Sequence, residues 1–275
     1  MAPTFVFLCG KSILSRIATT FARLKHDGQK GFIPFITAGD PDLQTTHDLI
    51  IELAQVGTSV IELGVPFSDP MADGPVIQRA SERALRHGFG LPEIFDVVRS
   101  VRTQTEVPIV LFSYFNPLLQ FGLEKLAREA EHSQLDGILV TDLIPEEAER
   151  FRSLLRAHEI DLIFLAAPTS TDERLRMIAE RATGFIYAVS RAGVTGARDE
   201  LSAEAEKLVK RVRAISDLPI AVGFGISTSA QVRDVWRYAD AAVVGSALVS
   251  EIDRAAPTGD LVTRVGQFVR LLIGQ

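Results

Sequence analysis

A short apolar run, a proline-rich turn and the start of a helix follow one another in Ile61-Glu62-Leu63-Gly64-Val65-Pro66-Phe67-Ser68-Asp69-Pro70-Met71-Ala72-Asp73-Gly74-Pro75. One carboxylate, Glu62, lies in the apolar run, and a second, Asp73, lies just before the helix start. A strand, a loop and a helix in this order form the repeating unit of α/β folds. In α/β barrels, catalytic groups come from strand ends and the loops that follow them. The pair therefore indicates acid–base chemistry at the mouth of an α/β barrel.

The same unit recurs along the whole chain. Short apolar runs predict eight strands, at residues 32–37, 59–63, 109–112, 137–141, 162–166, 184–189, 219–222 and 241–244. Most lack polar alternation, as expected of parallel strands that are covered on both faces. Amphipathic segments predict helices between the strands, at residues 41–55, 75–86, 92–103, 123–132, 145–158, 171–181, 202–215 and 228–238, and a last helix at 261–273 closes the chain.

Capping residues mark where two of these helices are expected to begin. A leading helix is predicted over residues 13–26, with Ser12 as its N-cap. Its residues Ile13, Ile17, Phe21 and Leu24 fall on one apolar stripe. Asp40 is expected to cap the helix at 41–55, with a proline at the first helical position.

Eight strands alternating with helices, without a linker, predict a single (β/α)8 TIM barrel over residues 13–275 with a leading N-terminal helix. The length of 275 residues suits this fold, which typically takes about 250 residues. Residues 1–12 are expected to be a flexible extension. The alternative is a doubly wound open sheet, but the nucleotide-binding loop that such sheets carry after their first strand is not evident here.

The composition limits the classes of binding partner and the cellular compartment that we expect for this protein. The net charge of −6 disfavours nucleic acid as a partner. No apolar stretch reaches the roughly 18 residues of a membrane span, and no basic region precedes the apolar segment at residues 4–9. A single cysteine excludes an internal disulfide and suits a reducing compartment. We therefore expect a cytoplasmic protein. The five histidines lack metal-ligand spacing, so no metal site is expected.

Each member of the acidic pair also has a structural explanation. A glutamate inside an apolar strand is costly unless it is paired or functional, so Glu62 is either catalytic or bonded to backbone amides or an arginine. Partial burial would raise the pKa of Glu62 and suit it to proton transfer near neutrality. Asp73 precedes Gly74 and Pro75, which is ordinary helix-start chemistry. The location of both acids in one strand–loop unit favours a shared function.

Later segments add further candidate groups. Tyr187 lies at a strand end, before a glycine-containing loop at 190–196 whose composition suits a mobile lid. The alternatives are a core tyrosine and an ordinary exposed turn. Residues 223–227 and 245–247 follow the seventh and eighth predicted strands, where barrels often bind phosphate through backbone amides. The alternative for these glycines is a tight turn without a ligand.

Residues 31–41, 61–75, 190–196 and 223–227 together resemble the alpha subunits of tryptophan synthases. The motif Glu-Leu-Gly-Val-Pro-Phe-Ser-Asp-Pro-x-Ala-Asp-Gly-Pro, which begins at Glu62, is the most specific part of a likeness that spans about residues 15–273. The resemblance implies a lyase of L-tryptophan biosynthesis. Its reaction is the retro-aldol cleavage of indole-3-glycerol phosphate to indole and glyceraldehyde 3-phosphate.

The resemblance also implies roles for individual residues. Glu62 would protonate indole C3 and later accept the glycerol hydroxyl proton, Asp73 would accept the indole N–H, and Tyr187 matches the active-site tyrosine. The phosphate-binding residues would be Gly196, Gly225, Gly245 and Ser246. The indole pocket and its floor would be formed by Phe35, Tyr114, Leu139, Thr141, Asp142 and Phe224. The lid would contain Arg191 and Thr195, and Thr195 would meet Asp73 on closure.

The resemblance implies an αββα heterotetramer with a beta subunit that holds pyridoxal phosphate, and no cofactor in this chain. The loop from Val65 to Pro75 would be both catalytic and interfacial. Three alternatives remain open: a stand-alone indole-glycerol phosphate lyase, another phosphate-binding barrel such as a sugar-phosphate isomerase, and a non-catalytic barrel that activates a partner. The Asp73 loop disfavours the second, and the intact acidic pair disfavours the third.

Overall fold

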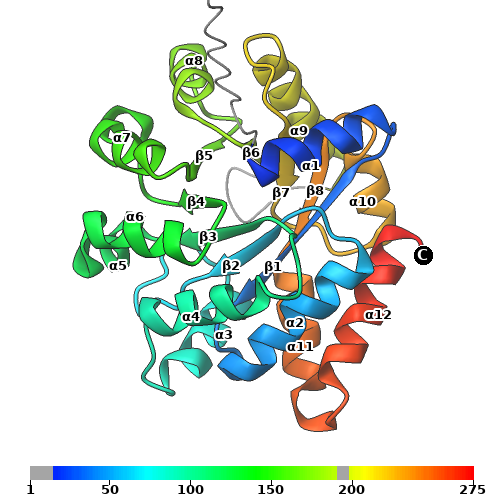
Figure 1. The fold of residues 1–275 in the computed structure, drawn as a ribbon. Coiled ribbons are helices and arrows are strands. Elements are labelled where there is room, and N and C mark those ends of the chain that lie inside the picture. The colour runs from blue at the N-terminus through cyan, green and yellow to red at the C-terminus, as the bar shows by residue number, and fades with distance from the viewer. Residues whose placement is uncertain (1–14, 191–197) are drawn as a thin grey trace, which may run out of the picture.

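The strands of the computed structural model form a closed parallel barrel in the order of the sequence (Figure 1). The structure describes residues 15–190 and 198–275. The strands are β1 (Gly31–Thr37), β2 (Ile61–Gly64), β3 (Ile109–Ser113), β4 (Gly137–Val140), β5 (Asp161–Ala166), β6 (Ile186–Val189), β7 (Ile220–Gly223) and β8 (Ala241–Val244). The predicted (β/α)8 barrel is confirmed, and each predicted strand is present with its ends within two residues of the prediction.

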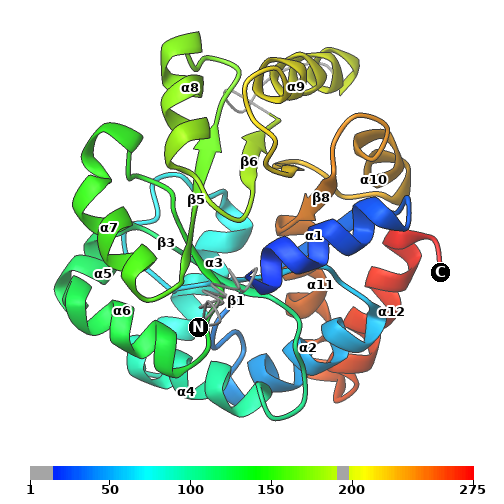
Figure 2. The same cartoon turned by 45° about the horizontal axis from the view of Figure 1, so that its top comes forward.

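Helices surround the barrel, as both views show (Figures 1 and 2). They are α1 (Arg16–His26), α2 (Leu43–Val56), α3 (Pro75–Leu85), α4 (Leu91–Val101), α5 (Phe115–Phe121), α6 (Leu123–His132), α7 (Glu149–Ala157), α8 (Asp172–Arg181), α9 (Arg198–Arg213), α10 (Ser229–Val235), α11 (Ser246–Ala255) and α12 (Leu261–Ile273). Short 3-10 turns, Pro145–Glu147 and Ala256–Thr258, precede α7 and follow α11. Within the described ranges, no helix is long and apolar enough to cross a membrane.

The predictions for two helix starts are wrong. Helix α1 follows an N-cap at Ser15, whose side chain accepts a hydrogen bond from the Ala18 amide, so Ser12 is not its cap. Helix α2 follows an N-cap at Asp42, which accepts a hydrogen bond of 2.7 Å from the Thr45 amide. Asp40 and Asp42 both fit the N-cap pattern. Asp40 is instead buried and bonded to an arginine.

Two helices, α5 and α11, were not predicted, and one predicted helix is interrupted. Pro117 in α5 resembles a turn signal, but it stands in the first turn, where a helix tolerates proline. Helix α11 starts after Gly245 without a capping side chain. The segment predicted as one helix at 145–158 is a 3-10 turn followed by α7.

Apolar side chains form one layer between the strands and helices and a second group inside the barrel. The inner group includes Ile17, Phe21 and Leu24 of α1, and the Phe21 ring lies 5.9 Å from that of Phe185. Helix α1 crosses one end of the barrel (Figure 2). Ser15 donates a 2.7 Å hydrogen bond to Asp161, the first residue of β5, so this is the end where strands begin. A site open to substrate is therefore expected at the opposite end. The predicted extension at residues 1–12 lies outside the described residues.

Candidate active site

A cavity of about 430 Å³ opens at the carboxyl ends of the strands. Both predicted catalytic acids, Glu62 and Asp73, line it, together with Tyr187. The other lining residues are Phe35, Ala72, Gly74, Ile77, Phe112, Val189, Phe224, Gly225, Val243, Gly245 and Ser246. The barrel thus gathers into one cavity side chains that are widely separated in the sequence, at the end where barrel enzymes place their active sites.

Glu62 is the second residue of β2, and its register partners are Phe35 on β1 and Val110 on β3. Its side chain lies at the cavity but is 1% exposed, and Oε1 has no hydrogen-bond partner. Burial raises the pKa of Glu62 to about 8. Among the described residues no arginine or backbone amide pairs with this carboxyl, which leaves the structural explanation of Glu62 without support. At neutral pH the group carries a proton that it can donate.

Gly64 and Gly223 leave room for the two aromatic rings beside Glu62. A Cβ atom on Gly64 would lie 2.5 Å from the Phe35 ring, and one on Gly223 would lie 1.9 Å from the Tyr187 hydroxyl. Neither separation is sterically allowed, so a larger residue at either position would displace the ring that lines the cavity. The glycine at the end of β2 is thus part of how the motif builds the site.

Asp73 comes from the loop between β2 and α3, immediately before the N-cap residue Gly74. The N-cap makes no side-chain hydrogen bond, and Asp73 instead accepts one of 3.2 Å from the Tyr114 hydroxyl. The Asp73 carbonyl accepts a further hydrogen bond of 2.9 Å from the side chain of Gln78. Burial raises the pKa of Asp73 to about 6, and the Tyr114 hydrogen bond opposes that rise. Asp73 is therefore mostly ionised at neutral pH and can accept a hydrogen bond from a ligand.

Tyr187 lies on the inner face of β6 and is buried. Its pKa is raised well above the ordinary value, first by burial and then by the nearby charge of Glu62. The tyrosine therefore remains a neutral phenol across the working pH range. Its ring packs edge-on against Phe224, with 5.9 Å between the ring centroids. Packing is thus only part of its environment, because Tyr187 also lines the cavity.

The glycine segments after β7 and β8 lie at the same cavity. Phe224 and Gly225 have φ values of 73° and 76°, and a positive φ is unusual for a residue such as phenylalanine. The Ser190 hydroxyl donates a hydrogen bond to the Phe224 carbonyl and helps to fix this turn. Gly245 is the N-cap of α11, whose first amides point towards the N-terminal end of that helix. The arrangement suits an anion. Gly196, also predicted for phosphate, lies outside the described residues.

Only some of the residues predicted for the indole pocket line the cavity. Phe35 and Phe224 line the cavity, whereas Leu139 is buried inside the barrel and Thr141 follows β4 with its amide bonded to Ser113. Sequence reasoning did not assign Ile77, Val189 and Val243 to the site, although their positions in predicted strands and at a helix start were available as a signal. Phe112 lies edge-on to Phe35 with 5.2 Å between the ring centroids. The predicted lid residues Arg191 and Thr195 lie outside the described residues.

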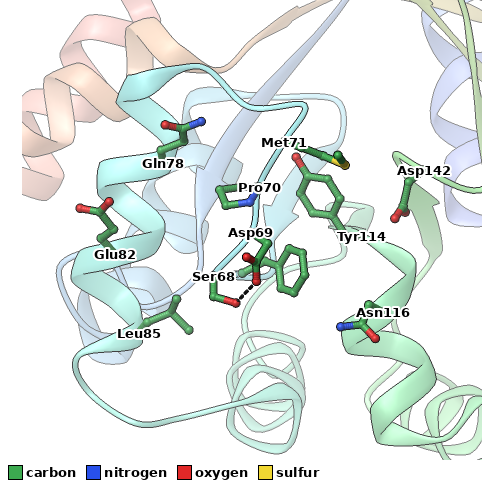
Figure 3. Close-up of a pocket in the computed structure, with 11 residues that line it drawn as sticks. Ser68, Asp69, Pro70, Met71, Gln78, Glu82, Leu85, Tyr114, Asn116 and Asp142 are labelled. Carbon is green, nitrogen blue, oxygen red and sulfur yellow. Dashed lines mark hydrogen bonds between the residues drawn. The ribbon is translucent and has the colours of Figure 1, made fainter.

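A second pocket, of about 650 Å³, is lined by the loop between β2 and α3, by α3 and by residues that follow β3 and β4 (Figure 3). Tyr114 lines this pocket rather than the active-site cavity, although its hydroxyl bonds to Asp73 and accepts a 2.9 Å hydrogen bond from the Ala72 amide. Asp142, predicted for the indole pocket floor, also lies here. The lining contains the carboxylates Asp69, Glu82 and Asp142 and no basic residue. Among the residues described, no group of three or more His, Cys, Asp or Glu side chains has a metal-binding arrangement.

Comparisons with known proteins agree with this geometry. The sequence model of the tryptophan synthase alpha chain family matches residues 21–270. The tryptophan synthase alpha chain of Geobacter sulfurreducens is 51% identical over 259 residues, which cover 94% of this chain and 98% of the relative. That of Geotalea uraniireducens is 50% identical over 260 residues, covering 94% and 97%.

Solved structures give the same result. Tryptophan synthase subunit alpha from Legionella pneumophila superposes with a TM-score of 0.87 at 38% identity, covering 95% of this chain and 99% of that one. A chain from the tryptophan synthase a2b2 complex of Pyrococcus furiosus gives 0.83 at 41% identity, covering 89% and 98%. The chain therefore belongs to the tryptophan synthase alpha chain family.

Proposed function

We propose that this chain cleaves indole-3-glycerol phosphate to indole and glyceraldehyde 3-phosphate, as the alpha subunit of a tryptophan synthase. The observation that carries the proposal is the pair of acids in one cavity, with Glu62 buried and unpaired and Asp73 held by Tyr114. Their raised pKa values, about 8 and about 6, give them different protonation states at neutral pH. Such a division between two carboxyls is typical of an acid–base site.

Glu62 performs both proton transfers. Breaking the bond between indole C3 and the glycerol chain requires a sink for the bonding electrons. Protonated Glu62 donates its proton to indole C3, and the ring becomes an iminium-like acceptor. The resulting carboxylate removes the proton from the hydroxyl on the carbon next to the ring. That carbon becomes the aldehyde, the bonding electrons return to the ring as indole leaves, and Glu62 is protonated again.

Asp73 stabilises the positive charge that develops on the indole nitrogen. Its carboxylate accepts the indole N–H, and the interaction strengthens as the ring is protonated, so it favours the transition state over the ground state. Tyr187 remains neutral and fills the wall of the cavity beside Glu62. Because protonation at C3 supplies the electron sink, the reaction draws on no cofactor in this chain.

The two ends of the cavity suit the two ends of the substrate. The phosphate would bind at Gly225, Gly245 and Ser246, and this is supported by their position at a positive-φ turn and at the N-terminus of α11. The aromatic rings of Phe35, Phe112 and Phe224 offer apolar surface to the indole. The roles of Leu139, Thr141, Gly196 and the lid residues Arg191 and Thr195 remain predictions from the resemblance.

The proposed partner is a beta subunit that holds pyridoxal phosphate, in an αββα assembly in the cytoplasm. The Pyrococcus relative is described as part of an a2b2 complex. In this chain the outer side of the catalytic loop carries a methionine, Met71, that is 87% exposed, beside the acidic pocket of Figure 3. A partner covering this surface would contact the loop that carries Asp73, and so would alter the position of a catalytic group.

A lyase assay with indole-3-glycerol phosphate, with and without a beta subunit, tests the proposal. We expect indole release by the isolated chain and a large rise in rate when the beta subunit is added. Release of indole at a rate that the beta subunit leaves unchanged would favour the stand-alone lyase. No indole release under either condition would refute the proposed reaction.

A further inference from the structure

Asp73 lies two residues before the start of helix α3, whose fully buried side chains are all small. These are Ala80, Ser81 and Ala84, whereas Val76 and Ile77 pack against the inner apolar group but are only partly buried. Dispersion contacts grow with the number of packed atoms, so small side chains hold a helix weakly against sliding along its axis. Asp73 is bonded to this helix through Gln78, so a shift of α3 would move the catalytic carboxylate.

Arg83 supplies the directional contacts that the packing lacks. Its Nε and Nη2 atoms donate hydrogen bonds of 2.7 and 2.8 Å to the two carboxylate oxygens of Asp40. Its Nη1 atom lies 3.0 Å from a carboxylate oxygen of Asp253. Two parallel hydrogen bonds from a planar guanidinium fix orientation as well as distance. Asp40 is 2% exposed and the Arg83 side chain 27% exposed, so the carboxylate of the pair is shielded from water.

The three residues of this clamp belong to three elements that build the cavity. Asp40 lies in the turn after β1, the strand that contributes Phe35. Asp253 lies on α11, whose first residue, Ser246, lines the proposed phosphate end of the cavity. Arg83 itself is not among the cavity-lining residues. Its effect on the reaction must therefore be transmitted through the elements that it joins.

We propose that Arg83 is a positioning residue: by clamping α3 between the turn after β1 and α11, it holds Asp73 in register with the phosphate end of the cavity. The inference rests on the proposed lyase function. Small displacements of a catalytic group lower turnover strongly, because the reacting atoms no longer meet in a productive geometry. Replacing Arg83 should therefore reduce turnover beyond any effect on folding.

The first test compares Arg83→Met with Arg79→Met in the complex with a beta subunit. Arg79 is exposed on the same helix, and no ion pair of the described residues includes it, so it is a matched control. We expect kcat for indole-3-glycerol phosphate to fall roughly tenfold or more in Arg83→Met, with KM changed less than about threefold. Arg79→Met should stay within about twofold of the wild type.

A second test separates positioning from stability. Arg83→Met alone leaves the buried Asp40 charge without its partner, and an unpaired buried charge lowers the stability of the fold. The double variant Asp40→Asn/Arg83→Met removes both charges. We expect it to regain thermal stability but not kcat, expressed per folded molecule. Arg83→Lys, which keeps the charge but cannot form two parallel bonds, should give an intermediate kcat.

Two results would overturn the inference. One is a kcat for Arg83→Met equal to that of Arg79→Met. The other is a kcat in the double variant that recovers together with its stability, since a purely structural role predicts that outcome. A wild-type enzyme without lyase activity would instead refute the proposed function, so the two failures are distinguishable.

Discussion

At the scale of single residues, the environment of Glu62 determines its chemistry. The carboxyl is 1% exposed, and its unpaired Oε1 makes the charged form costly. Glu62→Gln keeps the size of the side chain and removes the proton that is transferred. We expect turnover to fall on the order of 10²–10⁴-fold, the usual contribution of a general acid–base group. Indole release by the purified variant measures this loss, and turnover within threefold of the wild type would reject the role.

The same burial makes stability depend on pH in a defined direction. The pKa of Glu62 is about 8 in the folded protein, because of burial, against an ordinary value of 4.5. Between these values the folded state binds a proton that the unfolded state has released, so the free energy of unfolding falls as pH rises. The slope is at most about 1.4 kcal/mol per pH unit, and the loss is complete above the folded pKa.

Urea unfolding of the wild type and Glu62→Gln between pH 5 and 9 tests this dependence. Asp73 is present in both proteins, so its contribution cancels in the difference. We expect the wild type to lose stability relative to the variant up to about pH 8 and to follow it in parallel above that. A difference that is constant across the whole range would show that the folded pKa of Glu62 is not raised.

At the scale of elements, the catalytic loop is held by the end of a neighbouring strand. Tyr114, just after β3, bonds to the Ala72 amide and to the Asp73 carboxylate, and its hydrogen bond lowers the pKa of Asp73 against the effect of burial. Tyr114→Phe removes the bond, so the pKa of Asp73 should rise above about 6. The acid limb of kcat/KM, where Asp73 loses its charge, should then move to higher pH.

The pH profile of kcat/KM for Tyr114→Phe, measured beside that of Tyr187→Phe, checks this shift. Tyr187→Phe is a matched control because no hydrogen bond in the described part of the chain joins Tyr187 to Asp73. Its acid limb should stay where the wild type has it, even if its rate is lower. An acid limb that moves equally in both variants would show that Tyr114 does not tune Asp73.

At the scale of the whole molecule, the pattern of apolar runs in the sequence predicted the barrel. The barrel fold in turn implied that side chains at the carboxyl ends of its strands lie close together. The runs ending near Glu62 and Tyr187 were strands, and closure of the sheet brought both to one cavity. Asp40 was misassigned because its local sequence fits an N-cap, whereas its partner, Arg83, is supplied by a distant helix. Tyr114 was predicted for the indole pocket, but its orientation depends on the conformation of the catalytic loop. Local sequence carries no signal for such contacts.

The end of the barrel that α1 covers should contribute to the stability of the whole molecule. Phe21 of α1 is buried in the same apolar group as Phe35 and Tyr187, but it enters from the end where strands begin. Phe21→Ala should lower the free energy of unfolding by about 3–5 kcal/mol, since it leaves a cavity in a packed interior. Lys25→Ala, exposed on the same helix, should change it by less than about 0.5 kcal/mol.

Measuring the turnover of Phe21→Ala completes this test. Because the cavity that holds both acids lies at the opposite end of the barrel, Phe21→Ala should keep kcat within about threefold of the wild type at temperatures where it is folded. Urea unfolding and the lyase assay, run on the same preparations, measure both quantities. A loss of less than 1 kcal/mol would mean that α1 does not close the barrel core. A large loss of kcat in fully folded Phe21→Ala would mean that packing at the end closed by α1 also determines the geometry of the cavity at the opposite end. Stability and catalysis would then not depend on separate ends of the barrel.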